Sequence, residues 1–175
     1  MSRRILPLLL AFCLLSASSW ADSTVRKAPD FKIDMVDGSK ISIDQFHGKV
    51  VVLAMIMTTC PHCQAATRIL ASLQREFGPK GLQVLEAALD PMPAQKIPTF
   101  LKNFSPPFPV GYTTTTDSAL FMRLSTTKRY YVPYVTFIAR DGTIHGQYVG
   151  DDAFNKEEAQ AQNFRNMVVK LIGKK

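Results

Sequence analysis

The stretch Thr58-Thr59-Cys60-Pro61-His62-Cys63 lies where an uncharged apolar run, residues 50–57, meets a segment with helical spacing. Such a run is typical of a strand buried on both faces of a sheet. At the N-terminus of the following helix, free N–H groups stabilise an anion and therefore favour a nucleophilic thiolate at Cys60. Pro61 suits the first helical turn, where its missing N–H is no loss. Cys63 follows one turn inside the helix and can close a disulfide onto Cys60, so the pair predicts a redox site.

The same two cysteines could instead be half of a metal site or a structural bridge. A zinc site usually needs four ligands, and beyond residue 21 the chain has no third cysteine, while His47 and His145 stand alone. We therefore expect no structural metal. Transient copper binding by Cys60, His62 and Cys63 stays open as an alternative.

Residues 1–21 have the pattern of a secretory signal peptide. Arg3 and Arg4 form a charged start, an apolar run follows over residues 5–15, and Ser19-Trp20-Ala21 offers small residues for cleavage. The run is too short for an ordinary membrane span, and an uncleaved anchor is the alternative. Export places the chain in the periplasm or another exported compartment, where one remaining cysteine pair fits disulfide chemistry.

Charge and length limit the other function classes. Removing Arg3 and Arg4 lowers the formal net charge from +7 to +5. The basic residues are spread along the chain rather than clustered, so nucleic-acid binding is not indicated. Residues 22–29 are polar and predict a linker, and residues 30–175 are long enough for one domain with a substantial core.

Periodicity and turn signals predict an α/β domain with a central mixed sheet flanked by helices. Alternation over 31–35 and 40–43 around Asp37-Gly38 predicts an N-terminal hairpin. The next three elements, 50–57, 60–77 and 82–89, form a right-handed strand–helix–strand crossover. The remaining expected elements are a helix over 94–104, a strand over 108–112, a helix over 117–124 capped by Thr115 or Thr116, a hairpin over 134–149 and a helix over 154–172.

Four segments together resemble the exported thioredoxin-like thiol-disulfide oxidoreductases of the TlpA/ResA type, within the redoxin superfamily. They are Ala28-Pro29-Asp30-Phe31, Gly48-Lys49-Val50-Val51-Val52-Leu53, Cys60-Pro61-His62-Cys63, and Val132-Pro133-Tyr134-Val135-Thr136-Phe137-Ile138 followed by Asp141-Gly142. The resemblance implies a thioredoxin-like fold in which the hairpin is an extension. It also implies disulfide exchange with client protein thiols, a membrane-bound electron-transfer partner, and no cofactor beyond the redox-active disulfide.

The resemblance further implies the roles of individual residues. Cys60, Pro61, His62 and Cys63 would form the catalytic motif, and Pro133, after a cis peptide bond, would lie against the cysteines. The Val132 backbone would bind a client peptide. Tyr131 and Tyr134, with Tyr130, would add an aromatic rim; loop and strand packing is the alternative role for these tyrosines.

The chain also departs from this family at three positions. Thr59 replaces the usual tryptophan, and Ala54 and Ala66 stand where relatives carry groups that handle protons. Glu86 on the next strand could take over that task, although a partly exposed glutamate at a strand end is the more ordinary interpretation. The Pro-His pair between the cysteines resembles that of the DsbA-type dithiol oxidases.

Two other function classes remain as alternatives. A thiol peroxidase of the redoxin superfamily would carry a threonine three residues before its reactive cysteine, where this chain has Met57. A copper-binding thioredoxin-like chaperone would use the thiols as ligands, with little redox turnover.

Overall fold

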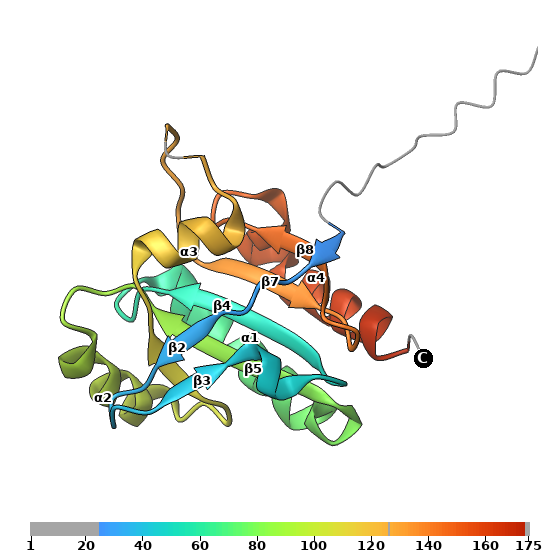
Figure 1. Cartoon of the computed structure of the whole chain (residues 1–175), viewed down its shortest axis with the longest axis horizontal. Coiled ribbons are helices and arrows are strands. Elements are labelled where there is room, and N and C mark those ends of the chain that lie inside the picture. The colour runs from blue at the N-terminus through green and yellow to red at the C-terminus, as the bar shows by residue number, and fades with distance from the viewer. Residues whose placement is uncertain (1–24, 126, 174–175) are drawn as a thin grey trace, which may run out of the picture.

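One mixed sheet forms the centre of the molecule (Figure 1). The computed structural model describes residues 25–125 and 127–173, so the expected signal peptide over 1–21 lies outside the described residues. Within this part of the chain the strand order is β1-β8-β7-β4-β5-β6-β2-β3. The strands are β1 Arg26–Lys27, β2 Lys32–Asp34, β3 Lys40–Ser42, β4 Val50–Ile56, β5 Leu82–Ala88, β6 Val110–Tyr112, β7 Tyr134–Ile138 and β8 Thr143–Tyr148.

The centre of the sheet contains the strands that carry the site. β4 runs parallel to β5, with Ala54 opposite Glu86, and antiparallel to β7, with Met55 opposite Tyr134. Every residue of β4 is buried, which confirms the expectation from its uncharged sequence. Because β4 and β7 are antiparallel, the loop after β4 and the loop before β7 lie at the same edge of the sheet.

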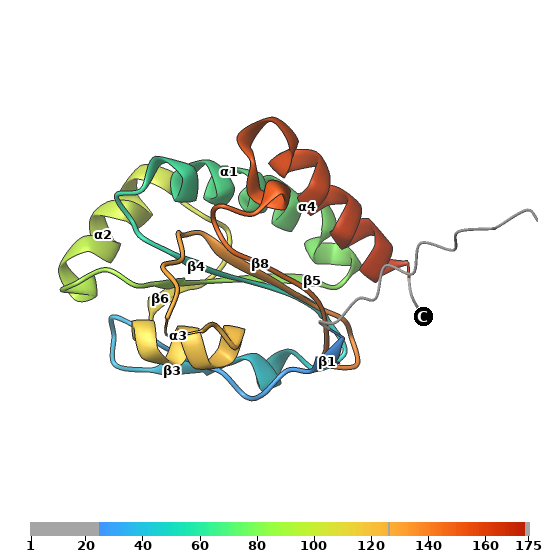
Figure 2. The ribbon, with the colours of Figure 1, turned by 90° about the horizontal axis from the view of Figure 1, so that it is seen from above.

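Helices cover both faces of this sheet. They are α1 Pro61–Phe77, α2 Pro93–Phe104, α3 Thr115–Met122 and α4 Glu157–Ile172, with 3-10 turns η1 Ile43–Phe46, η2 Gly78–Lys80 and η3 Ala153–Asn155. Figure 2 shows α1, α2 and α4 on one face, with α3 and the β2–β3 segment on the other. Two apolar cores result, because alternate residues of the central strands point to opposite faces. Val84 and Ala88 of β5 belong to the core beneath α1, and Leu85 and Ala87 to the other.

Several expected boundaries are wrong. Residues 22–29 are not a linker throughout, because Arg26 and Lys27 pair with Ile144 and Thr143 of β8. This two-residue strand is too short to give a periodic signal. The N-cap of α3 is Thr114, whose hydroxyl accepts a hydrogen bond from the Asp117 N–H, rather than Thr115 or Thr116. In the run of four threonines each residue has the same capping chemistry, so the sequence could not single out one of them.

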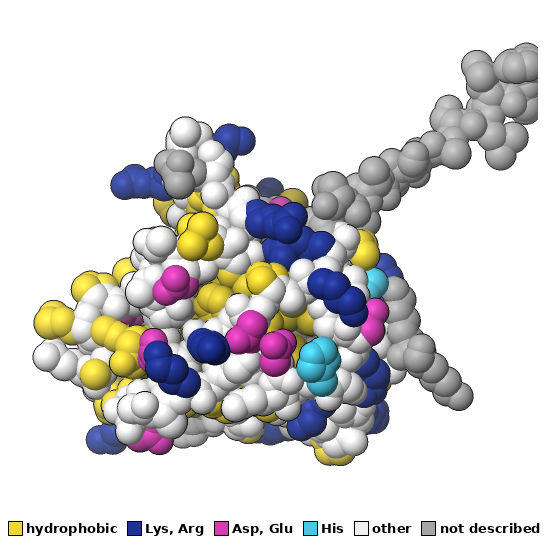
Figure 3. All heavy atoms as spheres, in the orientation of Figure 1, with side chains coloured by type: hydrophobic (Ala, Val, Ile, Leu, Met, Phe, Trp, Pro, Cys, Tyr) yellow, Lys and Arg dark blue, Asp and Glu magenta, His cyan; other side chains and the backbone are white. Residues whose placement is uncertain are grey.

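Among the described residues, no helix is both long and apolar enough to cross a membrane. On the face drawn in Figure 3, basic side chains lie at several separate places with acidic ones between them. This distribution agrees with the dispersed charge in the sequence.

Candidate active site

Cys60 lies where β4 leads into α1. It is the N-cap of α1, with an extended backbone (φ −80°, ψ 121°), and Pro61 occupies the first helical turn as expected. The N–H of Cys60 donates to the Met57 carbonyl at 3.0 Å, and its own carbonyl accepts from the Gln64 N–H at 3.0 Å. The backbone therefore holds Cys60 at the positive end of the helix, where its partly exposed sulfur can meet another thiol.

Cys63 differs from Cys60 by its burial. Both cysteines are free thiols in this structure, but Cys63 is 0% exposed in the core beneath α1. Burial strongly raises the pKa of Cys63, and a hydrogen bond with Cys60 and the charges of Cys60 and Glu86 raise it further. One contact opposes this shift, since the Met57 N–H points at the Cys63 sulfur at 3.5 Å. The geometry thus gives one accessible sulfur and one enclosed sulfur that strongly holds its proton.

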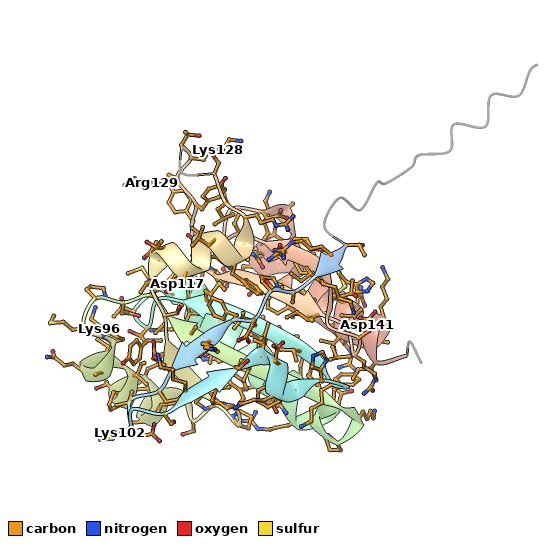
Figure 4. All side chains as sticks on the ribbon, viewed as in Figure 1. Lys96, Lys102, Asp117, Lys128, Arg129 and Asp141 are labelled. Atoms are coloured by element: carbon orange, nitrogen blue, oxygen red, sulfur yellow. The ribbon has the colours of Figure 1, made fainter. Side chains whose placement is uncertain are left out.

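Asp90 anchors the loop that precedes the cysteines. It follows β5 and is 6% exposed, and its carboxylate accepts from the Thr58 N–H at 2.7 Å and the Thr58 hydroxyl at 2.9 Å. Lys96 of α2 lies 3.4 Å from the same carboxylate, and Figure 4 shows this lysine on the α2 side of the molecule. Gln64 adds a bond to the Thr58 carbonyl at 2.9 Å.

No motif in the sequence points to a role for Asp90. The available signal was an aspartate directly after an apolar strand and before Pro91. That signal shows where a strand ends, but it does not show that two loops meet there.

Pro133 lies directly before Tyr134, the residue of β7 that pairs with Met55 near the end of β4. Pro133 therefore lies at the same end of the sheet as the cysteines that follow β4. Its side chain is buried, and the Val132–Pro133 peptide bond is cis. Buried Asn155 donates to the Pro133 carbonyl at 3.4 Å and to the Val149 carbonyl at 2.8 Å. The loops before β7 and after β8 are thereby held together beside the site.

Gly150 lets the backbone before Pro133 pack closely. A Cβ at Gly150 would lie 2.4 Å from the Val132 carbonyl oxygen and 2.5 Å from that of Tyr131. The Gly150 N–H also donates to the Tyr131 carbonyl at 2.5 Å. Only glycine fits here, because the close atoms belong to the backbone and cannot rotate away.

Two of the tyrosines expected to form an aromatic rim, Tyr131 and Tyr134, differ in exposure. Tyr131 is 56% exposed. It follows closely in sequence on Lys128 and Arg129, which lie on a loop that projects from the molecule (Figure 4). Tyr134 is 7% exposed and packs in the core that faces α3. Its assignment to a substrate-binding rim is therefore wrong, because alternation along β7 turns its ring inward. His62 is exposed, and it makes no hydrogen bond to another described residue.

Glu86 is not a partly exposed residue at a strand end. It lies inside β5 with 0% exposure, opposite Ala54 of β4 and Val110 of β6. Burial raises its pKa to about 8, although a hydrogen bond from Thr67 opposes the shift. The two alanines that replace the family's usual proton-handling groups, Ala54 and Ala66, are both buried in the same core.

Comparison with known proteins identifies the family. The AhpC/TSA family profile matches residues 25–147, which is most of the described chain. The chain belongs to the AhpC/TSA family. This membership confirms the resemblance to the redoxin superfamily.

Solved structures confirm the thioredoxin-like fold. A thiol:disulfide interchange protein of the thioredoxin family from Chlorobium tepidum TLS has a TM-score of 0.70 and 21% identity, with 87% of this chain and 100% of that chain covered. One from Bacteroides sp. has a TM-score of 0.67 and 17% identity, covering 87% and 93%. BsSco, of the Sco family of cytochrome c oxidase assembly proteins, has a TM-score of 0.61 and 15% identity, covering 86% and 96%.

One curated relative matches a shorter segment. "Probable glutathione peroxidase 8-A" of Xenopus laevis is 31% identical over 55 residues, which is 31% of this chain. The match spans only 26% of the length of that protein. Among the described residues, no group of three or more His, Cys, Asp or Glu side chains is placed to hold a metal ion.

Proposed function

We propose that this protein is an exported thiol-disulfide oxidoreductase that exchanges disulfides with client proteins through Cys60 and Cys63. One observation carries the proposal: the paired thiols begin α1 with the first accessible and the second enclosed. Exchange requires a sulfur that another protein can reach and a second sulfur that displaces or releases the client. The thiol:disulfide interchange proteins of the same fold support this reaction type.

Cys60 is the nucleophile and Cys63 the resolving cysteine. In the reducing direction, the Cys60 thiolate attacks a client disulfide, and the client's other sulfur leaves as a thiolate. Cys63 then attacks the Cys60 sulfur, which releases the second client thiolate and leaves a Cys60–Cys63 disulfide. Two electrons pass to the client, and the steps run backwards when the client is oxidised. The protein needs no cofactor beyond this dithiol pair.

The client segment binds beside Pro133 in this proposal. The backbone of Val132, held in place by Gly150 and Asn155, provides the peptide-binding edge, and exposed Tyr131 contacts the client next to it. Export of the protein follows from the sequence pattern of residues 1–21. Exchange with client protein thiols and a membrane-bound electron-transfer partner follow from the family resemblance.

Trapping tests the roles of the two cysteines. We expect Cys63→Ser to accumulate mixed disulfides with client proteins, because a client attached to Cys60 can no longer be displaced. Cys60→Ser should trap none, since enclosed Cys63 cannot reach a client. The measurement is non-reducing electrophoresis of the purified, reduced variants after reaction with a peptide that carries a disulfide bond. Equal trapping by both variants, or by neither, would contradict the assignment.

A thiol peroxidase is the second candidate, because a curated protein that matches a segment of this chain has a glutathione peroxidase name. In that reaction a cysteine sulfur would reduce a peroxide, and a second thiol would complete the disulfide. Consumption of hydrogen peroxide and of a peptide dithiol by the same sample separates the two functions. Peroxide turnover far above dithiol exchange would favour the peroxidase, whereas stoichiometric copper(I) retention without either activity would favour a copper chaperone.

A further inference from the structure

Glu86 is a charge-bearing side chain enclosed between the sheet and α1. The neighbours of Glu86 in β5 on the same face, Val84 and Ala88, belong to the apolar core beneath α1. Its partners across the sheet are Ala54 and Val110, which are equally buried in that core. A carboxyl group in such a place costs several kcal/mol if it is ionised and unpaired, so its retention there calls for a chemical explanation.

Only one oxygen of this carboxyl group has a partner. The Thr67 hydroxyl lies 2.9 Å from Oε1 of Glu86 and 3.0 Å from the Cys63 carbonyl. The other oxygen, Oε2, is buried and makes no hydrogen bond. Thr67 stands one helical turn after Cys63, so the carboxyl group lies beneath the same turn of α1 that carries the enclosed cysteine.

The enclosed cysteine has a matching need. When the Cys60–Cys63 disulfide opens, Cys63 is the sulfur that leaves, and it leaves as a thiolate. Burial disfavours that thiolate, and the Met57 N–H at 3.5 Å offers it a single weak donor. Since Cys63 is 0% exposed, solvent water does not reach its sulfur in this structure.

We propose that Glu86 is the acid that protonates Cys63 when the Cys60–Cys63 disulfide is opened, and the base that takes this proton back when the disulfide forms. The proposal rests on the thiol-disulfide exchange proposed above. A thiolate attacks Cys60, so a new S–S bond forms and the Cys60–Cys63 bond breaks. The bonding pair leaves with Cys63, the attacking sulfur is oxidised, and the proton moves from Glu86 to Cys63. Solvent later restores the proton to Glu86.

The surroundings of Glu86 keep its carboxyl group protonated, as proton donation to Cys63 requires. Burial raises the pKa of Glu86 to about 8, so the acid form predominates at neutral pH. The titratable group of α1 that interacts with Glu86 is Cys63, whereas Ala54 on β4 and Val110 on β6 are apolar. The described residues that shift the pKa of Glu86 include no cation. No ion pair therefore stabilises the charged form of Glu86.

The test is the rate at which dithiothreitol reduces the Cys60–Cys63 disulfide, measured from pH 6 to 9.5 and expressed per dithiothreitol thiolate. Dithiothreitol needs no client-binding surface, and acid quenching, alkylation and mass spectrometry count the remaining disulfide. We expect the wild-type rate constant to be level below pH 8 and to fall above it as Glu86 loses its proton. Glu86→Gln should show no such fall, and its rate at pH 6.5 should be at least about tenfold lower.

Two further variants separate proton transfer from structural support. Thr67→Val removes the hydrogen bond that lowers the pKa of Glu86, so the fall in rate should move to higher pH. Glu158→Gln alters an exposed glutamate of α4 and should behave as wild type. A Glu86→Gln profile with wild-type rate and shape, or an unmoved fall in Thr67→Val, would overturn the proposal.

The outcomes also distinguish this inference from the proposed function. A pH profile as expected with no trapping of a disulfide-bonded peptide by Cys63→Ser would refute client exchange alone. Normal trapping with a pH profile that does not depend on Glu86 would refute the role of Glu86 alone. Circular dichroism of each variant establishes that it is folded, and the neutral amide of Glu86→Gln suits a buried position.

Discussion

Cys60 and Cys63 are the same residue type three positions apart, and their surroundings give them different chemistry. Cys60 caps α1 at the surface, whereas Cys63 lies in the core with Glu86 near it. Burial raises the pKa of both Cys63 and Glu86, so each prefers to keep a proton. Ionising either group therefore also weakens the fold, which makes the protein's stability depend on pH.

The first prediction at this scale concerns the stability of the dithiol form. The pKa of Glu86 rises from 4.5 to about 8 on folding, so the native state binds this proton more strongly than the unfolded state does. The stabilisation is complete below pH 4.5 and is lost as pH rises through about 8. We expect the free energy of unfolding to fall by at most about 5 kcal/mol over this interval, from ~1.4 kcal/mol per pKa unit.

Urea unfolding of reduced wild-type protein and Glu86→Gln at pH 5, 7 and 9 measures this effect. The variant carries a neutral amide at every pH, so its advantage over the wild type should grow from pH 5 to pH 9. Glu158→Gln, with its exposed side chain, provides the control. A difference between Glu86→Gln and wild type that stays constant with pH would rule out a Glu86 carboxyl that must ionise within the folded core.

The sequence predicts some residues of this site but not others. Cys60, Pro61 and Cys63 follow from local rules, because capping, the first helical turn and the C-x-x-C spacing are all encoded within six residues. The burial of Glu86 is different, since it depends on α1 covering the strand at a point where the neighbouring residue of β4, Ala54, is small. Nothing within β5 itself distinguishes a buried glutamate from one at an exposed strand end.

At the scale of elements, the site is the meeting point of loops from different parts of the sheet. The loop before α1 is tied to the loop after β5 through Thr58 and Asp90. The loop before β7 is tied to the region after β8 through Asn155 and Gly150. These ties hold each pair of loops together, and the pairing of β4 with β7 sets the cysteines and the Val132 backbone relative to each other, as productive docking of a client requires.

The second prediction concerns Gly150. Gly150→Ala would place a Cβ 2.4–2.5 Å from two backbone oxygens, so the segment at Tyr131 and Val132 must shift. We expect disulfide exchange with a dithiol peptide to slow by about tenfold, since small displacements at a docking edge are costly. Reduction by dithiothreitol should change little, because that reagent does not use the edge.

Comparing the two rates in the same preparation makes the Gly150 test specific. Gly173→Ala is the matched control, because its Cβ would meet nothing closer than the Val169 carbonyl at 3.4 Å. Equal slowing of peptide and dithiothreitol by Gly150→Ala would indicate a general disturbance of the cysteines instead. Unchanged peptide exchange would remove the docking role from this segment.

Elements with strong local patterns follow from the sequence, including the short strands β2 and β3 of the N-terminal hairpin, whereas elements set by long-range contacts do not. The uncharged apolar run of β4 and the helical spacing of apolar residues in α1 predict the bounds of both elements to within one residue. Helix α4 begins at Glu157 rather than at 154, because residues 153–155 form a separate 3-10 turn capped by Asp152. Strand β1 was missed because its pairing with β8 is a long-range contact with no local signature.

At the scale of the whole molecule, the arrangement of charges around the cysteines bears on the direction of electron flow. A dithiol pair becomes oxidising when its reduced form is stabilised. The N-terminus of α1 favours the Cys60 thiolate, and alanines at positions 54 and 66 bring no negative charge near it. Glu86 does lie close by, but with a pKa of about 8 it is mostly uncharged at neutral pH and opposes the thiolate little.

The last prediction is therefore a reduction potential above the about −270 mV of thioredoxin, towards the about −120 mV of DsbA. His62 contributes because its imidazole, between the two cysteines, can donate a hydrogen bond to the Cys60 thiolate or carry a positive charge near it. His62 is exposed, so solvent weakens the effect, and His62→Ala should lower the potential by about 30 mV or less, a tenfold change in the equilibrium constant at most.

Equilibration with glutathione measures both values. His47→Ala is the matched control, because exposed His47 precedes β4, whereas the cysteines follow it. A wild-type potential at or below that of thioredoxin, or equal potentials for wild type and His62→Ala, would show that another part of the molecule sets the direction of exchange.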